Sequence, residues 1–557
     1  MTQKLPKSFF YFLSTIFLIN LLQSHFTELI FDEAYYWYYA QDMAWGYFDH
    51  PPMVALLVKI SSFFFNGELG VRFMSCILSA GTTIFLWFLI DSEKKKEYVP
   101  HFFALVFSMT LLNAYGFFTL PDTPLLFFTA LFLWIYKKFI AAPSITLSVI
   151  LGITMAALMY SKYHAVLVIV FVLLSNIKLI TNKYAWLAVV IALVCFTPHF
   201  IWLFENDFIS IKYHISERPN QAYKFEKFTL GFILNLVAIF GFTFPLVYYA
   251  LFKSKNTDKF TNALRYLTYG VLIFFFISSF SKRVQTQWII IVCIPMVVLV
   301  ANYMLKNDTH RKWLCRLALI NIAIILFLRI GLVHEPFSPI LYESHQNKKW
   351  VNAITSEVGD MPVVFENSYR NASMYAFYSG NISYSLNNIH YRQNQYTIDS
   401  SQYKVQHQKI LYISNYLNKW DLNFDGKGDG KTKAKYIDNF ESFKSIRCIV
   451  EDDIFSLKSQ KEYILKVYNP YNQTIDLNKI KFGIAYTNAY KTVKEVHSLV
   501  PIKQNKQNKT LKAKDSTLFL FKLVPPTKPE DLEYFKISIS ENNLPFGLNS
   551  KTIKLEK

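Results

Sequence analysis

A succession of about eleven apolar runs constrains this chain more than any other feature of its sequence. The runs lie near residues 8–26, 70–90, 101–119, 124–139, 144–160, 164–181, 185–204, 229–252, 263–281, 287–305 and 314–333. A helix rises about 1.5 Å per residue, so roughly 20 apolar residues cross the hydrocarbon core of a bilayer. We therefore predict a polytopic α-helical membrane domain over residues 1–333, with about eleven spans and a range of about ten to thirteen.

The composition supports membrane insertion and argues against nucleic acid as a partner. Hydrophobic residues make up 52% of the chain, and the mean hydropathy is +0.21. The net charge of +19 arises from basic residues in short loops between apolar runs and in a polar tail. Basic loops of this kind anchor a membrane protein at its cytoplasmic face. The expected surroundings are therefore membrane lipids.

The lysine-rich loops also predict the orientation. Numbered alternately, they fall on one side of the membrane: residues 94–96, 137–138, 178–183, 253–259 and 306–312. Lys4 and Lys7 precede the first run, which has no cleavage site after it. We expect a multi-pass protein of the cytoplasmic (inner) membrane with a cytoplasmic N-terminus. Everything after residue 334 is expected on the extracytoplasmic or periplasmic side.

The polar tail has the patterns of folded soluble structure. Helical spacing at 349–358 and 372–378 alternates with short apolar runs at 361–366 and 409–413, which predicts an α/β domain over residues 334–440. Alternating runs between polar turns predict antiparallel strands and a β-sandwich-like domain over residues 441–557. These runs lie at 463–468, 479–486, 516–523 and 534–540.

Acidic residues gather on the predicted outer side, where charge beside a membrane is costly and needs a reason. Asp32 and Glu33 directly follow the first span, and Asp49 with His50 precedes Pro51-Pro52. Asp122 lies in a turn between Pro121 and Pro124 that is too short to need a charge for solubility. A carboxylate held there can take a proton from a hydroxyl nucleophile. The alternative is a solvated loop with aromatic anchors.

Cations occupy the same predicted face, which suits a phosphate group. They are Lys162, His164, His214, Arg218, Lys282 and Arg283. Taken singly, each is also compatible with a basic side chain that ends a span and extends to the interface. Asp49 and His214 are candidate ligands of a divalent metal ion, although no close metal-ligand spacing marks them. No phosphate-cradling or nucleotide-binding glycine motif is present.

Four segments of the membrane part resemble bacterial membrane glycosyltransferases of the dolichyl-phosphate-mannose-protein mannosyltransferase superfamily, in the style of lipid A aminoarabinose transferases. The segments are 32–36 (DEAYY), 46–52 (GYFDHPP), 119–127 (TLPDTPLLF) and 161–163 (SKY). The resemblance covers about residues 8–330. It implies a GT-C fold, in which a first extracytoplasmic loop with interfacial helices covers a cavity between spans. It also implies a polyprenyl-phosphate sugar donor and an inverting transfer to an acceptor hydroxyl.

The resemblance assigns a role to each candidate residue. It makes Asp32 the general base, Glu33 a neighbour that holds the acceptor or Asp32 itself, and Asp122 a second acid for positioning or charge balance. His50, Lys162, His214 and Arg218 are then candidates for the lipid phosphate, with Lys282 and Arg283 in a loosely matching late loop. His50 stands where the aminoarabinose transferases carry a lysine, so phosphate binding there would depend on pH or on another residue.

The residues leave the acceptor and some alternatives open. The acceptor is a glycolipid such as lipid A or a protein of the cell envelope. A transporter or flippase of a lipid-linked saccharide is the main alternative, although such proteins tend to show internal repeats and midplane sites. A catalytically silent scaffold whose tail binds glycan or envelope proteins is the third possibility.

Overall fold

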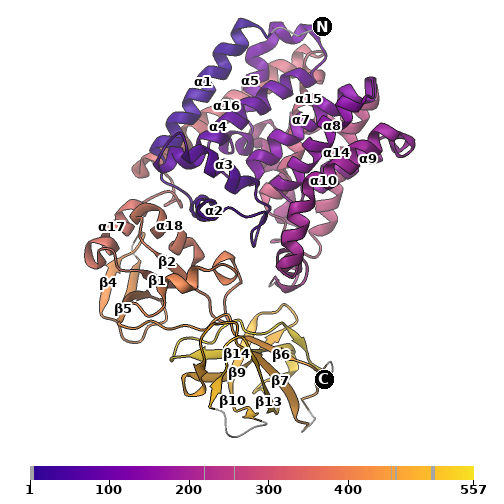
Figure 1. Cartoon of the computed structure of the whole chain (residues 1–557). Helices are drawn as coiled ribbons and strands as arrows, with labels where there is room; N and C mark the ends of the chain where they lie inside the picture. Colours follow the sequence, from indigo (N-terminus) through magenta and orange to yellow (C-terminus); the bar gives the residue numbers. More distant parts are fainter. Residues whose placement is uncertain are drawn as a thin grey trace. The chain divides into compact units, whose positions relative to one another are not determined.

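The computed structural model describes residues 5–218, 220–255, 258–428, 430–452, 455–457, 461–503 and 509–556. The chain forms two compact units, both drawn in Figure 1. The membrane unit comprises Met1–Phe208 and Tyr223–His345, and the C-terminal unit comprises Ile209–Ala222 and Gln346–Lys557. The C-terminal unit therefore includes a short segment from between two apolar helices. The sequence had placed that segment in the membrane domain.

Seven helical stretches among the described residues are long and apolar enough to cross a membrane. They are α1 (Lys7–Phe26), α4 (Gly67–Leu89), α7 (Asp122–Ala141), α10 (Lys183–Glu205), α12–α13 (Thr229–Phe240 and Phe244–Lys253), α14 (Lys259–Ser278) and α16 (Asp308–Val333). Shorter helices account for the other predicted spans: α5 (Val99–Phe107) with α6 (Thr110–Ala114), α8 (Ile145–Ser161), α9 (Ala165–Leu174) and α15 (Cys293–Met304). The prediction of a polytopic helical membrane protein is confirmed.

Two of the predicted apolar runs, 229–252 and 101–119, are each divided into two helices. Gly241 has φ +54°, a conformation that glycine adopts readily, and it separates α12 from α13. The run at 101–119 ends its first helix at Phe107 and resumes at Thr110. Among the helices, α15 is almost completely buried, with Val297, Val298 and Val300 fully inaccessible. A helix that is apolar on every side is typical of one enclosed by other helices.

Two helices lie between the first two long spans, as the resemblance implied for the first loop. They are α2 (Phe31–Gln41) and α3 (Met53–Ser62), both visible in Figure 1. We refer to residues 27–66, which join α1 to α4, as the first loop. At the other end of the unit, His345 Nε2 lies 2.8 Å from the Gly331 carbonyl oxygen, which ties the chain after α16 back to that helix.

The C-terminal unit contains the predicted α/β and β-sandwich structure. A five-stranded sheet has the order β2 (Ser383–Leu386), β1 (Val363–Glu366), β3 (Ile410–Ile413), β5 (Lys431–Ile437) and β4 (Leu422–Asp425). Strand β1 pairs in parallel with both β2 and β3. The two predicted helices are α17 (Asn347–Val358) and α18 (Tyr369–Ser379), and Gly380 ends α18 at φ +75°.

Two four-stranded antiparallel sheets follow. Their orders are β10 (Val493–Leu499), β9 (Ile480–Asn488), β14 (Leu532–Glu541), β15 (Ile553–Lys554), and β11 (Ile502–Lys503), β13 (Ser516–Phe521), β7 (Tyr463–Tyr468), β6 (Arg447–Val450). Side chains of both sheets share one core, in which the Phe482 and Phe519 rings are 5.5 Å apart. The soluble β-rich region is thus confirmed. The division of the tail at residue 440, which falls between β5 and β6, stays a prediction.

Candidate functional site

A buried ion pair anchors the start of α2, where the acidic motif lies. Arg72 of α4 donates from Nε to Glu33 Oε1 at 2.7 Å and from a terminal nitrogen to Oε2 at 2.5 Å. Both side chains are fully inaccessible to solvent. Two parallel bonds of this kind fix the carboxylate in direction as well as position. The Glu33 carboxylate is therefore held in a fixed, buried position.

The Arg72–Glu33 pair also forms hydrogen bonds with the neighbouring segments of the chain. Arg72 also donates to the carbonyl oxygens of Ser24, Thr27 and Glu28, at the end of α1 and just beyond it. Glu33 accepts a bond from the Thr119 backbone nitrogen at 2.9 Å, just before the turn that carries Asp122. We call Arg72, Glu33 and these partners the arginine hub. The hub connects the end of α1, the start of α2, α4 and the turn before α7.

Asp32 lies beside the hub but faces a different environment. It occupies the first turn of α2 and is partly exposed, whereas Glu33 is buried. Successive helix residues point about 100° apart, so one carboxylate enters the hub while the other stays accessible.

Asp122 and Lys162 form a second buried ion pair. The Lys162 ammonium donates to both Asp122 oxygens, at 2.7 and 2.9 Å. Their side chains are only 4% and 7% exposed. Asp122 begins α7, and Lys162 follows the last residue of α8, so the pair joins two helix ends. The structure thus brings together two residues that the sequence singled out separately.

Tyrosines hold the remaining part of the first loop. Asp49 is nearly buried, and the Tyr35 and Tyr39 hydroxyls donate to it at 3.3 and 3.5 Å. Burial raises the pKa of Tyr47 to about 12, which keeps this phenol as a donor to the carbonyl oxygens of Tyr39 and Asp42. His50 is half-buried, with its ring 5.7 Å from that of Tyr36. The loop is therefore an ordered, hydrogen-bonded structure around its acids.

The other predicted cations lie in two different places. Lys282 and Arg283 are exposed in the turn after α14. The His164 ring packs 5.7 Å from Phe275 and 5.5 Å from Trp288, which brings the turn at 161–164 beside the segment that contains these two cations. His214 and Arg218 lie instead in the segment that belongs to the C-terminal unit. Their assignment to the donor phosphate stays a prediction.

The structure adds nothing in favour of a metal ion. Within the described ranges, no group of three or more His, Cys, Asp or Glu side chains has a metal-binding arrangement. Of the two candidate ligands, Asp49 accepts hydrogen bonds from tyrosines, and His214 belongs to the other unit. We therefore derive no step through a metal, and the divalent ion stays a prediction.

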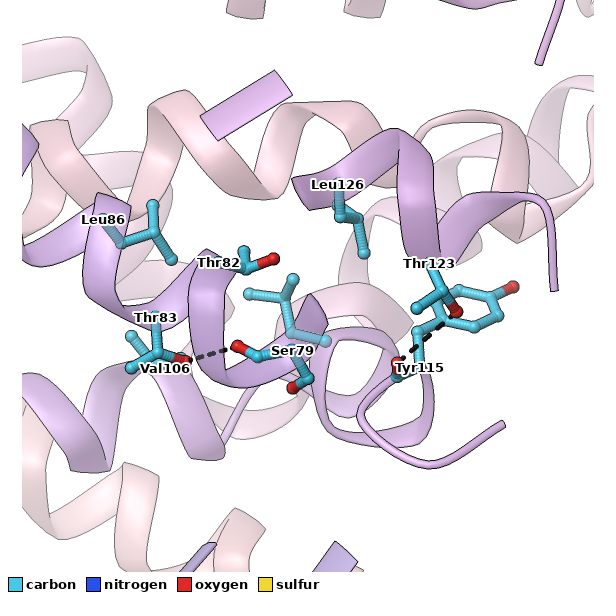
Figure 2. A pocket seen from close by; sticks show the side chains of 9 residues that line it. Ser79, Thr82, Thr83, Leu86, Val106, Tyr115, Thr123 and Leu126 are labelled. Atoms are coloured by element: carbon cyan, nitrogen blue, oxygen red, sulfur yellow. Dashed lines mark hydrogen bonds between the residues drawn. The ribbon is translucent and has the colours of Figure 1, made fainter. Parts of the chain in front are cut away.

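A small cavity lies next to the Asp122 turn. Its volume is about 30 Å³, and its lining includes Ser79, Thr82 and Thr83 of α4 together with Tyr115 and Thr123 (Figure 2). The Thr123 hydroxyl, one residue after Asp122, donates to the Phe118 carbonyl oxygen at 3.0 Å. A space of this size suits water and not a sugar. The cavity is thus part of the helix packing next to the Asp122 turn.

The segment 209–222 makes its own set of contacts inside the C-terminal unit. The Thr552 hydroxyl donates to Glu217 at 2.6 Å, and the ammonium groups of Lys491 and Lys536 are each 3.8 Å from the same carboxylate. The Asn220 backbone nitrogen donates to the Tyr490 carbonyl oxygen at 3.1 Å. The β-sandwich therefore holds a segment whose two ends run into α10 and α12.

Replacing Glu217 by glutamine should loosen this segment. Glutamine keeps an acceptor for Thr552 but removes the negative charge that faces two lysines, and burial already lowers the pKa of Lys536. Loss of these half-buried ion pairs costs about 1 kcal/mol, roughly a fivefold rise in local opening. Limited proteolysis should show correspondingly faster cleavage within residues 206–228. Glu226→Gln, an exposed change in the same loop, should leave the cleavage rate unchanged.

The sequence pointed to Asp32, Asp122 and Lys162 but missed two residues that organise them. Arg72 lies inside the apolar run at 70–90, and an ionisable residue within such a run is itself a signal of function. His199 lies in α10 and contacts both the first loop and Tyr163. A single histidine in an apolar helix gives no such signal, because its partners are remote in sequence.

Comparison with known proteins finds similarity in both sequence and fold. The model of the family described as dolichyl-phosphate-mannose-protein mannosyltransferase matches residues 49–202. That range includes Asp49, His50, Asp122 and Lys162 and begins after Asp32. The lipid A galacturonosyltransferase RgtD of Rhizobium johnstonii is 20% identical over 292 residues, which span 49% of this chain and 60% of RgtD.

Solved structures share the fold. ArnT from Cupriavidus metallidurans in the apo state matches with a TM-score of 0.55 and 12% identity, covering 72% of this chain and 92% of ArnT. The same ArnT bound to undecaprenyl phosphate matches with a TM-score of 0.51, 12% identity and the same coverage. The predicted similarity to this group of glycosyltransferases is confirmed, and so is the GT-C fold.

Proposed function

We propose that this protein is a membrane glycosyltransferase that moves a sugar from a polyprenyl-phosphate donor to an acceptor hydroxyl. The single observation that carries the proposal is the buried Asp122–Lys162 pair in the same unit as the anchored start of α2, where Asp32 stays accessible. An accessible carboxylate can act as a base, and the fixed ammonium group of Lys162 can stabilise a leaving phosphate.

Asp32 acts as the general base in this proposal. Its carboxylate takes the proton of the acceptor hydroxyl as the acceptor oxygen attacks the anomeric carbon. The bond from that carbon to the phosphate oxygen breaks, and the polyprenyl phosphate leaves. Because attack comes from the face opposite the leaving group, the anomeric configuration inverts. Glu33 serves by fixing the backbone of α2 through the arginine hub, since its carboxylate is fully buried.

Lys162 is the main candidate for the leaving phosphate. The phosphate leaves as a dianion and is stabilised by a fixed positive charge. The Lys162 ammonium uses two of its donors on Asp122, and an ammonium group has a third. Asp122 holds Lys162 in place and lowers the cost of burying it. His50, Lys282, Arg283, His214 and Arg218 are further candidates for the donor phosphate.

The relatives and the charge pattern support a particular acceptor and location. RgtD is named as a lipid A galacturonosyltransferase, which supports a glycolipid such as lipid A as the acceptor. One ArnT structure holds undecaprenyl phosphate, which supports a polyprenyl-phosphate donor. A protein acceptor is the second candidate. The lysine-rich loops support transfer at the outer face of the cytoplasmic membrane.

A reconstitution experiment tests the proposal. Purified protein in lipid vesicles receives polyprenyl-phosphate donors carrying aminoarabinose, galacturonic acid, mannose or galactose, together with lipid A or a peptide acceptor. Mass spectrometry should detect one acceptor that gains the mass of one sugar, and NMR should show the inverted linkage. Movement of the intact donor across the vesicle membrane without transfer would instead support the flippase. In parallel, envelope glycolipids of a strain that lacks the protein should lose one sugar mass from one class.

A further inference from the structure

His199 is a completely buried histidine in the apolar helix α10. Both of its ring nitrogens have partners outside the helix. Nδ1 lies 2.7 Å from the Trp45 carbonyl oxygen, and Nε2 lies 3.1 Å from the Tyr163 hydroxyl. Because a carbonyl oxygen only accepts, Nδ1 carries the proton, and Nε2 then accepts from Tyr163. A buried side chain of α10 therefore joins two segments that are far apart in sequence.

Both segments belong to the candidate site. Trp45 lies at the tip of the first loop, between α2 and the Asp49-His50 pair, and Tyr163 directly follows Lys162. The Lys162 side chain is held by Asp122 at the same turn. His199 thus fastens the loop that carries Asp32 and the turn that carries Lys162 to a single helix.

Packing at the next residue supports the same contact. A Cβ atom on Gly46 would lie 2.3 Å from Cε3 of Trp202, which is one turn beyond His199 on α10. The Trp202 and His199 rings stack with centroids 6.0 Å apart and an interplanar angle of 11°. Only glycine allows the loop tip to approach this surface. The tip is therefore fitted to α10 by shape as well as by hydrogen bonding.

Two points of the first loop, the start of α2 and the tip, are held by bonds of different strength. The start of α2 is fixed by the fully buried, charged Arg72–Glu33 pair. The tip is held to His199 by a neutral hydrogen bond from a ring nitrogen. A bidentate hydrogen bond between charged groups is stronger than a single hydrogen bond between neutral groups. We therefore expect the tip to open before the start of α2.

We propose that His199 is a positioning residue for sugar transfer, a latch that fastens the tip of the first loop to α10 and to the Lys162 turn. Its loss frees the tip, and donor binding weakens because the loop and the phosphate-binding turn are no longer held together. The effect on donor binding rests on the proposed function. The latch itself does not.

Hydrogen exchange on the full-length protein in detergent tests the latch without any substrate. His199→Phe should raise exchange of backbone amides around residues 43–48 by about tenfold, because a local hydrogen bond and its packing are lost. Amides at 30–36, which the arginine hub protects, should exchange as before. Thr197→Val, an exposed change two residues away on α10, is the control. Unchanged exchange at 43–48, or a uniform rise throughout the membrane unit, would overturn the latch.

Conservative variants separate the two bonds. The side-chain amide of His199→Asn can replace Nδ1–H toward Trp45 but cannot reach Tyr163, so this variant should restore most of the protection at 43–48. Tyr163→Phe should raise the KM for the polyprenyl-phosphate sugar about fivefold in the native background, and it should add nothing to His199→Asn. Additive effects of the two changes would contradict a shared hydrogen bond.

The two proposals fail in different ways. If exchange at 43–48 rises as expected but no donor supports transfer, then the glycosyltransferase function is wrong and the latch stands. If transfer is observed and His199→Phe leaves both the exchange and the KM for the donor unchanged, then the latch is wrong. Gly46→Ala gives an independent check, because its Cβ should free the tip with His199 intact.

Discussion

Replacing Asp32 by asparagine is expected to lower the rate of sugar transfer by about 10²–10⁴-fold, which is the usual contribution of a positioned general base. Asparagine has nearly the same shape as aspartate but cannot take a proton from the acceptor hydroxyl. The loss should therefore appear in kcat, with the KM for the lipid donor little changed. Initial rates with a polyprenyl-phosphate sugar in detergent or vesicles measure both quantities.

The design depends on showing that the protein still folds. Asp32 is partly exposed, and asparagine keeps the shape of its side chain, so Asp32→Asn should leave the thermal unfolding midpoint unchanged. Asp42→Asn removes an exposed carboxylate from the same loop and serves as the matched control with normal activity. If Asp32→Asn keeps more than half of the native rate, another group must take the proton.

Replacing Arg72 by methionine is expected to destabilise the membrane unit by about 3–5 kcal/mol, the usual cost of leaving a buried charge without its partner. Glu33 would remain buried without its cation, and the carbonyl oxygens of Ser24, Thr27 and Glu28 would lose their donor. For a unit of this size, the unfolding midpoint should fall by on the order of 10 °C. Thermal unfolding followed by tryptophan fluorescence in detergent measures the shift.

Replacing both Arg72 and Glu33 shows how much of the destabilisation comes from the unpaired Glu33 carboxylate. Adding Glu33→Gln to Arg72→Met removes the unpaired carboxylate, so part of the stability should return, and the coupling follows from a double-mutant cycle. Recovery should be incomplete because the bonds from Arg72 to the backbone are still absent. Glu93→Gln, which breaks the exposed Lys96–Glu93 pair, should have no measurable effect. Equal shifts for the exposed and buried pairs would contradict the importance of the hub.

Much of the site could be predicted because it reflects local constraints. A carboxylate that directly follows a membrane span, as Asp32 does, must face water or a partner whatever the rest of the fold. The proline turn at 121–124 similarly fixes where Asp122 lies in the chain. These inferences needed only the length of the apolar runs and the cost of charge near lipid. The helices and strands of the tail followed from periodicity in the same way.

The pairing of these residues could not be predicted, because it joins segments that are far apart. Arg72 meets Glu33, and Lys162 meets Asp122, only after helices from distant parts of the sequence pack together. Nothing local indicates that the segment 209–222 belongs with the β-sandwich and not with the helices on either side of it. Hydropathy describes each segment alone, and contacts between segments depend on tertiary packing.

Asp32 and Glu33 show the difference most clearly. The sequence alone was enough to place two adjacent acids at the outer end of the first span and to predict chemistry there. Which of them is available for that chemistry depended on the fold, because the turn of α2 directs Glu33 to Arg72 and leaves Asp32 partly exposed. The same holds for His199, whose role arises only when the tip of the first loop and the Lys162 turn meet the same helix.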